Sequence, residues 1–171
     1  MLRQNNVSEA DKNIAKALDI ADEKNVEVLQ AVAEAYINGG KDHAMKAKEI
    51  LDMAIKLSAK KKDKRNYLLM GDMYMTQNDG SAAVENFKRA VDIDSSAVAL
   101  VNIGKIFNYI KNYDEAELSF NNAIRIDPNY SVAYKEMAEL KYSLKQYDEA
   151  IKNYEKYIQL SENSIENEKR I

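Results

Sequence analysis

The stretch Ala97–Tyr130, AVALVNIGKIFNYIKNYDEAELSFNNAIRIDPNY, sets a pattern that most of the chain repeats. Its apolar residues recur at intervals of three and four, which places them on one face of a helix. Asp114 and Glu115 are expected in the first turn of a second helix, where acidic side chains favour the helix dipole. The second helix is expected to end before Pro128. The stretch therefore predicts two helices in one unit of 34 residues.

The residue types of this unit follow a fixed order. They are Leu100, Ile103-Gly104 and Phe107 in the leading half, and Ala116, Phe120, Ala123 and Pro128 in the trailing half. A tetratricopeptide repeat has an aromatic, a Leu-Gly pair, a Tyr, an Ala, a Phe and a Pro in this order over 34 residues. The unit therefore resembles a tetratricopeptide repeat, although Leu100 replaces the aromatic.

Other parts of the chain match the same positions, so the resemblance covers nearly all of it. We expect one domain, residues 1–171, made of a leading helix (7–24), four repeats (26–61, 64–96, 97–130 and 131–164) and a truncated next helix or tail (165–171). The resemblance implies an all-α fold, a right-handed α-α superhelix or solenoid of four helix pairs. In such a solenoid each repeat contacts its neighbours around a continuous core.

The ends and turns of this array depart from a simple repeat. The leading helix has the spacing of a second helix without its first, which fits either a native cap or a chain cut from a longer protein. Segment 165–171 would begin another first helix but is too short to be stable alone. Gly39-Gly40 predicts a longer turn in the first repeat. In the second repeat we expect Asn78-Asp79-Gly80-Ser81 to supply the turn, with Gly80 able to take a positive φ.

Small residues in the repeats predict close contact between paired helices. Gly71 and Gly104 each cost ~1 kcal/mol in a helix interior, so we expect a gain from helix packing that exceeds this cost. The fourth repeat departs twice from this pattern: Lys141 stands where an aromatic residue is expected, and Tyr157 stands where a small one is expected.

The composition excludes several classes of protein. A net charge of -3 gives no general attraction to nucleic acid or to an anionic membrane. The absence of cysteine excludes disulfides and thiolate chemistry, and no apolar run is long enough to span a membrane. With no targeting signal in the chain, we expect a soluble protein whose compartment the residues do not indicate.

The sequence offers no catalytic or metal-binding pattern, so we expect no enzyme activity, no metal and no cofactor. His43 is the single histidine, and we expect it in a surface or capping role. The pairs Asp114-Glu115 and Asp148-Glu149 fit helix N-termini better than acid–base chemistry. The basic run 60–65 could bind an acidic peptide, phosphate or nucleic acid, but we interpret it as a solvated junction between repeats.

The resemblance implies a concave groove lined by the first helices of the repeats. The repeat positions that face into this groove in the family correspond to named residues of this chain. They are Arg65, Leu68, Leu69, Asp72, Met75, Val98, Val101, Asn102, Lys105, Tyr109, Lys135, Glu139 and Tyr142, with Glu136 at a further inward position. The groove is apolar in the middle with acids toward both ends. The expected partner is a protein or peptide with apolar anchors and some positive charge, not nucleic acid.

The expected function is a protein-interaction scaffold or adaptor, as a module of a larger protein. The alternatives are a structural self-association module and an accessory subunit of an enzyme or carbohydrate-handling complex. Chaperone-binding members of the family clamp a peptide carboxylate with Lys and Asn at two groove positions, which hold Gln30 and Glu34 in the first repeat. Acids near a carboxylate repel it, so we expect this clamp to be absent.

Overall fold

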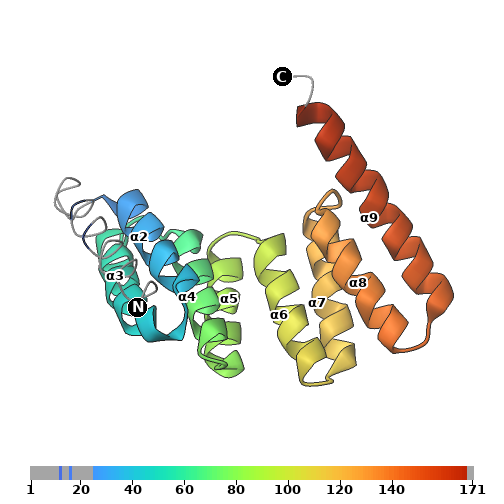
Figure 1. Ribbon diagram of the computed structural model, residues 1–171, viewed down its shortest axis with the longest axis horizontal. Helices are drawn as coiled ribbons and strands as arrows, with labels where there is room; N and C mark the ends of the chain where they lie inside the picture. The colour runs from blue at the N-terminus through green and yellow to red at the C-terminus, as the bar shows by residue number, and fades with distance from the viewer. Residues whose placement is uncertain (1–11, 13–15, 17–24, 169–171) are drawn as a thin grey trace, which may run out of the picture. The chain divides into compact units, whose positions relative to one another are not determined.

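The computed structural model describes Lys12, Lys16 and residues 25–168, with side chains through Glu162. The predicted leading helix at 7–24 lies outside these residues except for the two lysines. The described residues contain helices and no strand, which confirms the all-α prediction (Figure 1). The elements are α2 (Val26–Asn38), the 3-10 helix η1 (Lys41–His43), α3 (Ala44–Leu57), α4 (Lys64–Thr76), α5 (Gly80–Ile93), α6 (Ala97–Tyr109), α7 (Tyr113–Ile126), α8 (Ser131–Ser143) and α9 (Tyr147–Glu168).

The chain divides into two compact units, residues 1–86 (unit 1) and 87–171 (unit 2), with the boundary inside α5. In unit 1, α2 and α3 form a helix pair and α4 packs against both. The core between them includes Ala33, Leu51, Leu69, Met70 and Met73. Apolar residues at helical spacing thus bury one face of each helix, as the sequence predicts.

Unit 2 contains two helix pairs, α6 with α7 and α8 with α9, and α8 also packs against α6 and α7 (Figure 1). Its core includes Phe120, Met137 and Leu140. A Cβ atom on Gly104 would lie 2.4 Å from Cε1 of Phe120. The absence of a side chain on Gly104 therefore lets α6 approach the ring on α7, as we expect from the sequence.

Short turns join the helices of each pair. Asn78, Lys111 and Lys145 have φ angles of 60°, 62° and 63° at equivalent places in three turns. The prediction for Gly80 is therefore wrong: Asn78 takes the positive φ, and Gly80 begins α5. An asparagine tolerates this conformation because its side chain is short and polar.

The first pair has the longer turn that Gly39-Gly40 predicts. Gly40 has a φ of 91°, and η1 fills the additional length before α3. At the other end of the chain, α9 is a single helix of 22 residues that runs through Ser164 to Glu168.

Candidate partner-binding surface

The predicted binding residues lie on the first helices of the pairs. Arg65, Leu68, Leu69, Asp72 and Met75 belong to α4 in unit 1. Those of unit 2 belong to two helices: Val98, Val101, Asn102, Lys105 and Tyr109 to α6, and Lys135, Glu139 and Tyr142 to α8. They therefore form two groups, one in each unit.

Two of these residues are core residues and not surface residues. Leu69 is 7% exposed in the core of unit 1, and Val101 is 2% exposed in the core of unit 2. Each lies on the side of its helix that meets the neighbouring helices. Their burial corrects the expectation that both line a groove open to a partner.

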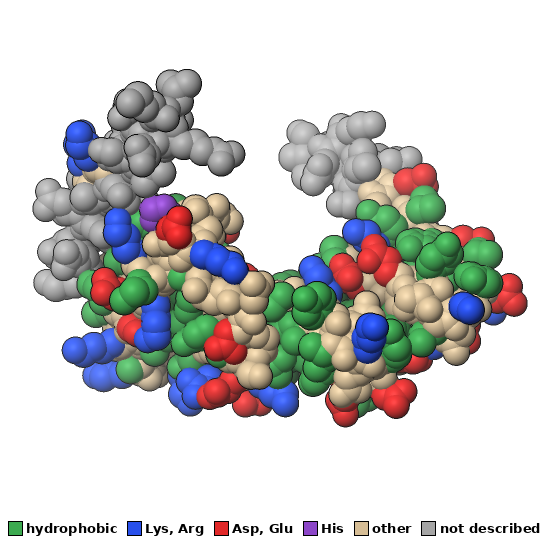
Figure 2. Space-filling model, turned by 60° about the horizontal axis from the view of Figure 1, so that its bottom comes forward, with side chains coloured by type: hydrophobic (Ala, Val, Ile, Leu, Met, Phe, Trp, Pro, Cys, Tyr) green, Lys and Arg blue, Asp and Glu red, His purple; other side chains and the backbone are tan. Residues whose placement is uncertain are grey.

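The remaining residues of unit 2 lie on α6 and α8, two helices that pack against each other. Tyr109 is 88% exposed, Tyr142 is 62% exposed, and Val98 is exposed as well. We call this surface the α6–α8 face and define it by Val98, Asn102, Lys105, Tyr109, Lys135, Glu136, Glu139 and Tyr142. Figure 2 shows that hydrophobic, basic and acidic side chains are interspersed on the side of the molecule it displays.

Ion pairs balance the charges of the α6–α8 face. Lys105 Nζ lies 4.0 Å from Glu136 Oε1, across the two helices. Lys135 Nζ lies 3.5 Å from Glu139 Oε1, one turn along α8. With both lysines beside a glutamate, the face offers little net charge to an incoming anion.

Glu136 lies in a partly buried position within this face. Burial raises the pKa of its carboxyl group, and Glu139 raises it further, while Lys105 and Lys135 act in the opposite direction. The net shift is upward, so the nearby lysines do not fully compensate for the loss of water.

Replacing Glu136 with glutamine is expected to raise the stability of the protein slightly at pH 7, by less than about 1 kcal/mol. A carboxyl whose pKa is higher in the folded state binds more protons there, so stability falls as pH rises through that range. The advantage of E136Q should therefore shrink as the pH is lowered and the wild-type carboxyl becomes protonated. Urea unfolding of both proteins at several pH values measures this, and E139Q, on the same face, is the control.

Gln30, a groove position of the first repeat, belongs to a side-chain network in unit 1. Gln30 Nε2 donates to Asp63 Oδ2 at 2.7 Å and to Asn66 Oδ1 at 2.8 Å. Asn66 Nδ2 donates to Ser58 Oγ at 2.9 Å, which ties the end of α3 to α2 and α4. Gln30 is therefore buried, with its side-chain amide bonded to Asp63 and Asn66, and is not available to a partner.

An ion pair also engages the second position of the predicted clamp. Arg65 Nη2 on α4 lies 3.0 Å from Glu34 Oε2 on α2. At the position where a carboxylate-binding repeat has asparagine, the first repeat therefore has Glu34, which forms an ion pair with Arg65.

Lys141 departs from the repeat pattern because it joins three helices. It is a buried residue of α8 whose Nζ lies 2.7 Å from Glu117 Oε1 on α7 and 2.9 Å from Glu149 Oε2 on α9. Burial acts to lower the pKa of Lys141, but the hydrogen bonds and charges of the two glutamates outweigh it and raise the pKa. The other repeats have an aromatic residue at this position. Here the aliphatic stem of Lys141 packs in its place, and the amino group forms ion pairs with the two glutamates.

Replacing Lys141 with alanine is expected to cost about 1–2 kcal/mol, because the stem and both hydrogen bonds are lost while the glutamates stay in contact with water. Methionine at this position keeps the stem and should cost less than about 1 kcal/mol. The raised pKa means that the ionic contribution is complete below the usual lysine value of 10.5 and is lost as pH rises above it. Chemical unfolding from pH 8 to 11 should therefore bring wild type and K141M closer together.

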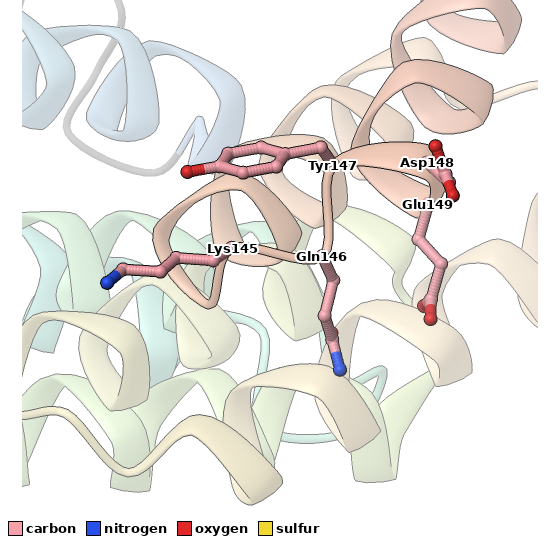
Figure 3. A pocket seen from close by; sticks show the side chains of 5 residues that line it. All are labelled: Lys145, Gln146, Tyr147, Asp148 and Glu149. Atoms are coloured by element: carbon pink, nitrogen blue, oxygen red, sulfur yellow. The ribbon is translucent and has the colours of Figure 1, made fainter.

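The structure contains an aromatic contact at the turn between α8 and α9 that the sequence did not predict. Tyr142 and Tyr147 make an edge-to-face contact with ring centroids 5.6 Å apart. Beside it lies a pocket of about 280 Å³ lined by residues 145–149. Figure 3 shows Lys145 and Tyr147 directed to one side of the turn and Gln146 and Glu149 to another. This arrangement adds aromatic surface next to the α6–α8 face but brings no catalytic groups together.

His43 and the basic run between α3 and α4 show no sign of a catalytic or metal-binding role among the described residues. His43 stacks on Tyr36 with ring centroids 5.8 Å apart and makes no side-chain capping hydrogen bond. Lys60, Lys61 and Lys62 are exposed between α3 and α4. Among the described side chains, no three His, Cys, Asp or Glu residues are arranged to hold a metal ion. No helix in the described part of the chain is both long and apolar enough to cross a membrane.

Antiparallel helix pairs of repeating sequence, with exposed aromatic residues on their first helices, define a helical-repeat protein-interaction scaffold. Tetratricopeptide repeat family models match residues 97–130, and residues 65–96 and 133–164, which together are more than half of the chain. The chain belongs to the tetratricopeptide repeat family.

Curated relatives share part of the chain. RNA polymerase II-associated protein 3 of Xenopus tropicalis is 32% identical over 97 residues, which are 56% of this chain and 15% of the relative. Small glutamine-rich tetratricopeptide repeat-containing protein 2 of Mycosarcoma maydis is 29% identical over 91 residues, which are 53% of this chain and 26% of the relative. The matched segments thus span 15% and 26% of the length of these relatives.

Solved structures share the fold. A crystal structure of MamA is similar to this chain with a TM-score of 0.73 at 22% sequence identity. The aligned region covers 96% of this chain and 95% of the MamA chain. The second tetratricopeptide domain of Spaghetti (RPAP3), bound to the HSP90 peptide SRMEEVD, is similar with a TM-score of 0.55 at 23% sequence identity. The aligned region covers 62% of this chain and 99% of that domain. Both likenesses are below 25% identity and show the fold alone.

Proposed function

We propose that this protein binds a peptide or a partner helix on the α6–α8 face, as one module of a larger protein. The observation that carries this proposal is the exposure of Val98, Tyr109 and Tyr142 on first helices whose lysines are paired with glutamates. Exposed aromatic residues are typical anchors of protein interfaces because they bury a large area at low entropic cost. On α4, the group of Arg65, Leu68, Asp72 and Met75 is proposed as a second contact region.

The chemistry of the face favours a partner with apolar anchors. The paired charges of Lys105 with Glu136 and of Lys135 with Glu139 lower the attraction for an acidic peptide. Glu136 is mostly buried and not fully compensated, so a cationic side chain of the partner would be stabilised near it. The proposed partner is therefore neutral or basic.

The HSP90 peptide SRMEEVD is expected not to bind this protein at roughly 100 μM. The relevant groove positions of the first repeat hold Gln30, which is bonded inside the core, and Glu34, which is paired with Arg65. Isothermal titration calorimetry measures this, with the second tetratricopeptide domain of Spaghetti (RPAP3), which binds the peptide, as a positive control. A micromolar Kd would show that a carboxylate site exists that these contacts do not explain.

A random peptide library displayed on phage and selected against the 171-residue protein tests the proposal itself. The selected peptide should bind V98D and Y109D at least tenfold more weakly than wild type. The matched control is L118D, since Leu118 is an exposed apolar residue on α7 outside this face. Binding that L118D weakens as much as Y109D, or a selection that yields no peptide, would overturn the proposal.

A further inference from the structure

The last helix of the described chain is α9 (Figure 1). A stripe of apolar side chains runs along it. It consists of Tyr147, Ile151, Tyr154 and Ile158, and we call it the α9 stripe. Spacings of four, three and four residues keep these side chains on one side of the helix. Tyr147, Ile151 and Ile158 are each between 51% and 55% exposed. Large apolar residues exposed together in this way mark an interaction surface.

The equivalent stripe of α7 carries a helix. Its members, 34 positions earlier in the repeat, are Tyr113, Glu117, Phe120 and Ile124. Phe120 is fully buried in a core that contains Met137 and Leu140 of α8, and Tyr113 and Ile124 pack against the same core. Lys141 of α8 lies 2.7 Å from Glu117. The following helix, α8, therefore lies directly on this stripe of α7.

Unit 1 repeats this arrangement independently. Leu51 and Ile55 occupy the same positions on α3 and pack in a core with Leu69, Met70 and Met73 of α4. In both units, this side of a second helix is a platform for another amphipathic helix. The α9 stripe has the same positions and apolar side chains, and about half of the surface of three of them remains in water.

A row of acids accompanies the α9 stripe and indicates what kind of helix fits it. Asp148, Glu155 and Glu162 are exposed and follow one another at intervals of seven residues. Helical geometry places this row beside the stripe, on the side away from α8, because buried Ala150 lies on the other side of the stripe. The corresponding positions of α7 are Asp114, Asn121 and Pro128, so the complete acidic row belongs to α9.

We propose that the α9 stripe binds an amphipathic helix of another protein whose apolar side is flanked by a row of lysine or arginine residues. Apolar residues of the partner bury against Tyr147, Ile151 and Ile158, as α8 buries against α7. The basic row pairs with Asp148, Glu155 and Glu162, which fixes the partner's orientation. A second copy of α9 lacks such a basic row, and in an antiparallel pair it would bring two acidic rows together.

Two synthetic helical peptides of about three heptads test this proposal. Both carry leucine at the a and d positions and alanine elsewhere, except that the e and g positions are lysine in one peptide and glutamate in the other. Fluorescence anisotropy measures their binding to the 171-residue protein. The lysine peptide should bind at least tenfold more tightly at low ionic strength, and the difference should fall as salt is added.

Variants of α9 assign the binding to this surface. I151D should weaken binding of the lysine peptide at least tenfold. L118D should leave this binding unchanged, although Leu118 on α7 is an apolar residue as exposed as Ile151. The double variant E155K/E162K should reverse the preference in favour of the glutamate peptide. V98D and Y109D should weaken binding of the lysine peptide far less than I151D does, which separates this site from the α6–α8 face.

Two results would overturn the proposal. One is equal affinity for the two peptides, or lysine-peptide binding that I151D does not change. The other is a wild-type dimer, detected by light scattering, that I151D converts to a monomer, since this would assign the stripe to a second copy of the chain.

Discussion

Replacing Gly104 with leucine is expected to unfold the α6–α7 pair. A Cβ at this position would already lie 2.4 Å and 2.7 Å from two ring atoms of Phe120, which is fully buried. Overpacking of this kind should cost roughly 3–5 kcal/mol, the upper range for a single substitution. The melting temperature should fall by about 10 °C for a chain of this length. Hydrogen exchange should show the loss of protection in α6 and α7.

Smaller changes at the same contact separate packing from helix propensity. G104A improves the propensity of α6 by ~1 kcal/mol, yet it should still destabilise, because the added Cβ itself meets the ring. F120L removes ring atoms, and the loss caused by G104A should be smaller in that background. Unchanged thermal stability of the leucine variant would show that Gly104 has no packing role.

Replacing Asn66 with leucine is expected to cost about 2–3 kcal/mol in unit 1. Asn66 is fully buried, and its loss leaves one N–H of buried Gln30 without its acceptor. Q30L should cost a similar amount, since Asn66 Oδ1 then loses the donor. Both are measured as the free energy of unfolding in urea.

The double variant Q30L/N66L is the sharper measurement. Removing both amides leaves neither a Gln30 N–H nor Asn66 Oδ1 unpaired, and Asp63 and Ser58, which also lose a partner, are only partly buried. The cost of the double variant should therefore be at least about 1 kcal/mol below the sum of the single costs. Additive costs would mean that the two amides do not depend on each other. N38L, an exposed asparagine on α2, should change stability by less than about 0.5 kcal/mol.

The helices were predictable because their information is local. The spacing of Ala116, Phe120 and Ala123 defines one buried face within a single helix, and all three are fully buried. The same local pattern predicted the close approach at Gly104. The turn before α5 contains the predicted Asn78 and Asp79, but its positive φ belongs to Asn78 and not to Gly80. Both residue types tolerate this conformation, so the residue types alone do not select between them.

The candidate surface was only partly predictable. Positions in the repeat placed Tyr109 and Tyr142 on exposed faces of α6 and α8, and both are exposed. The same rule placed Leu69 and Val101 there, although both are buried. Whether a residue at the edge of a helix face is covered depends on the size and angle of neighbouring helices, which the repeat pattern does not specify.

The order of residues was sufficient to establish repeated helix pairs, the small residue at each close contact and membership of the tetratricopeptide repeat family, because these depend on periodicity within about 34 residues. The three-dimensional arrangement was needed to explain Lys141, whose partners Glu117 and Glu149 lie on two other helices. It was also needed to find the buried bond between Gln30 and Asn66, and to distinguish the stripe of α7, which is covered, from that of α9, which is half exposed. Burial and ion pairing arise between helices that are distant in sequence, so they follow from packing and not from the pattern within any one helix.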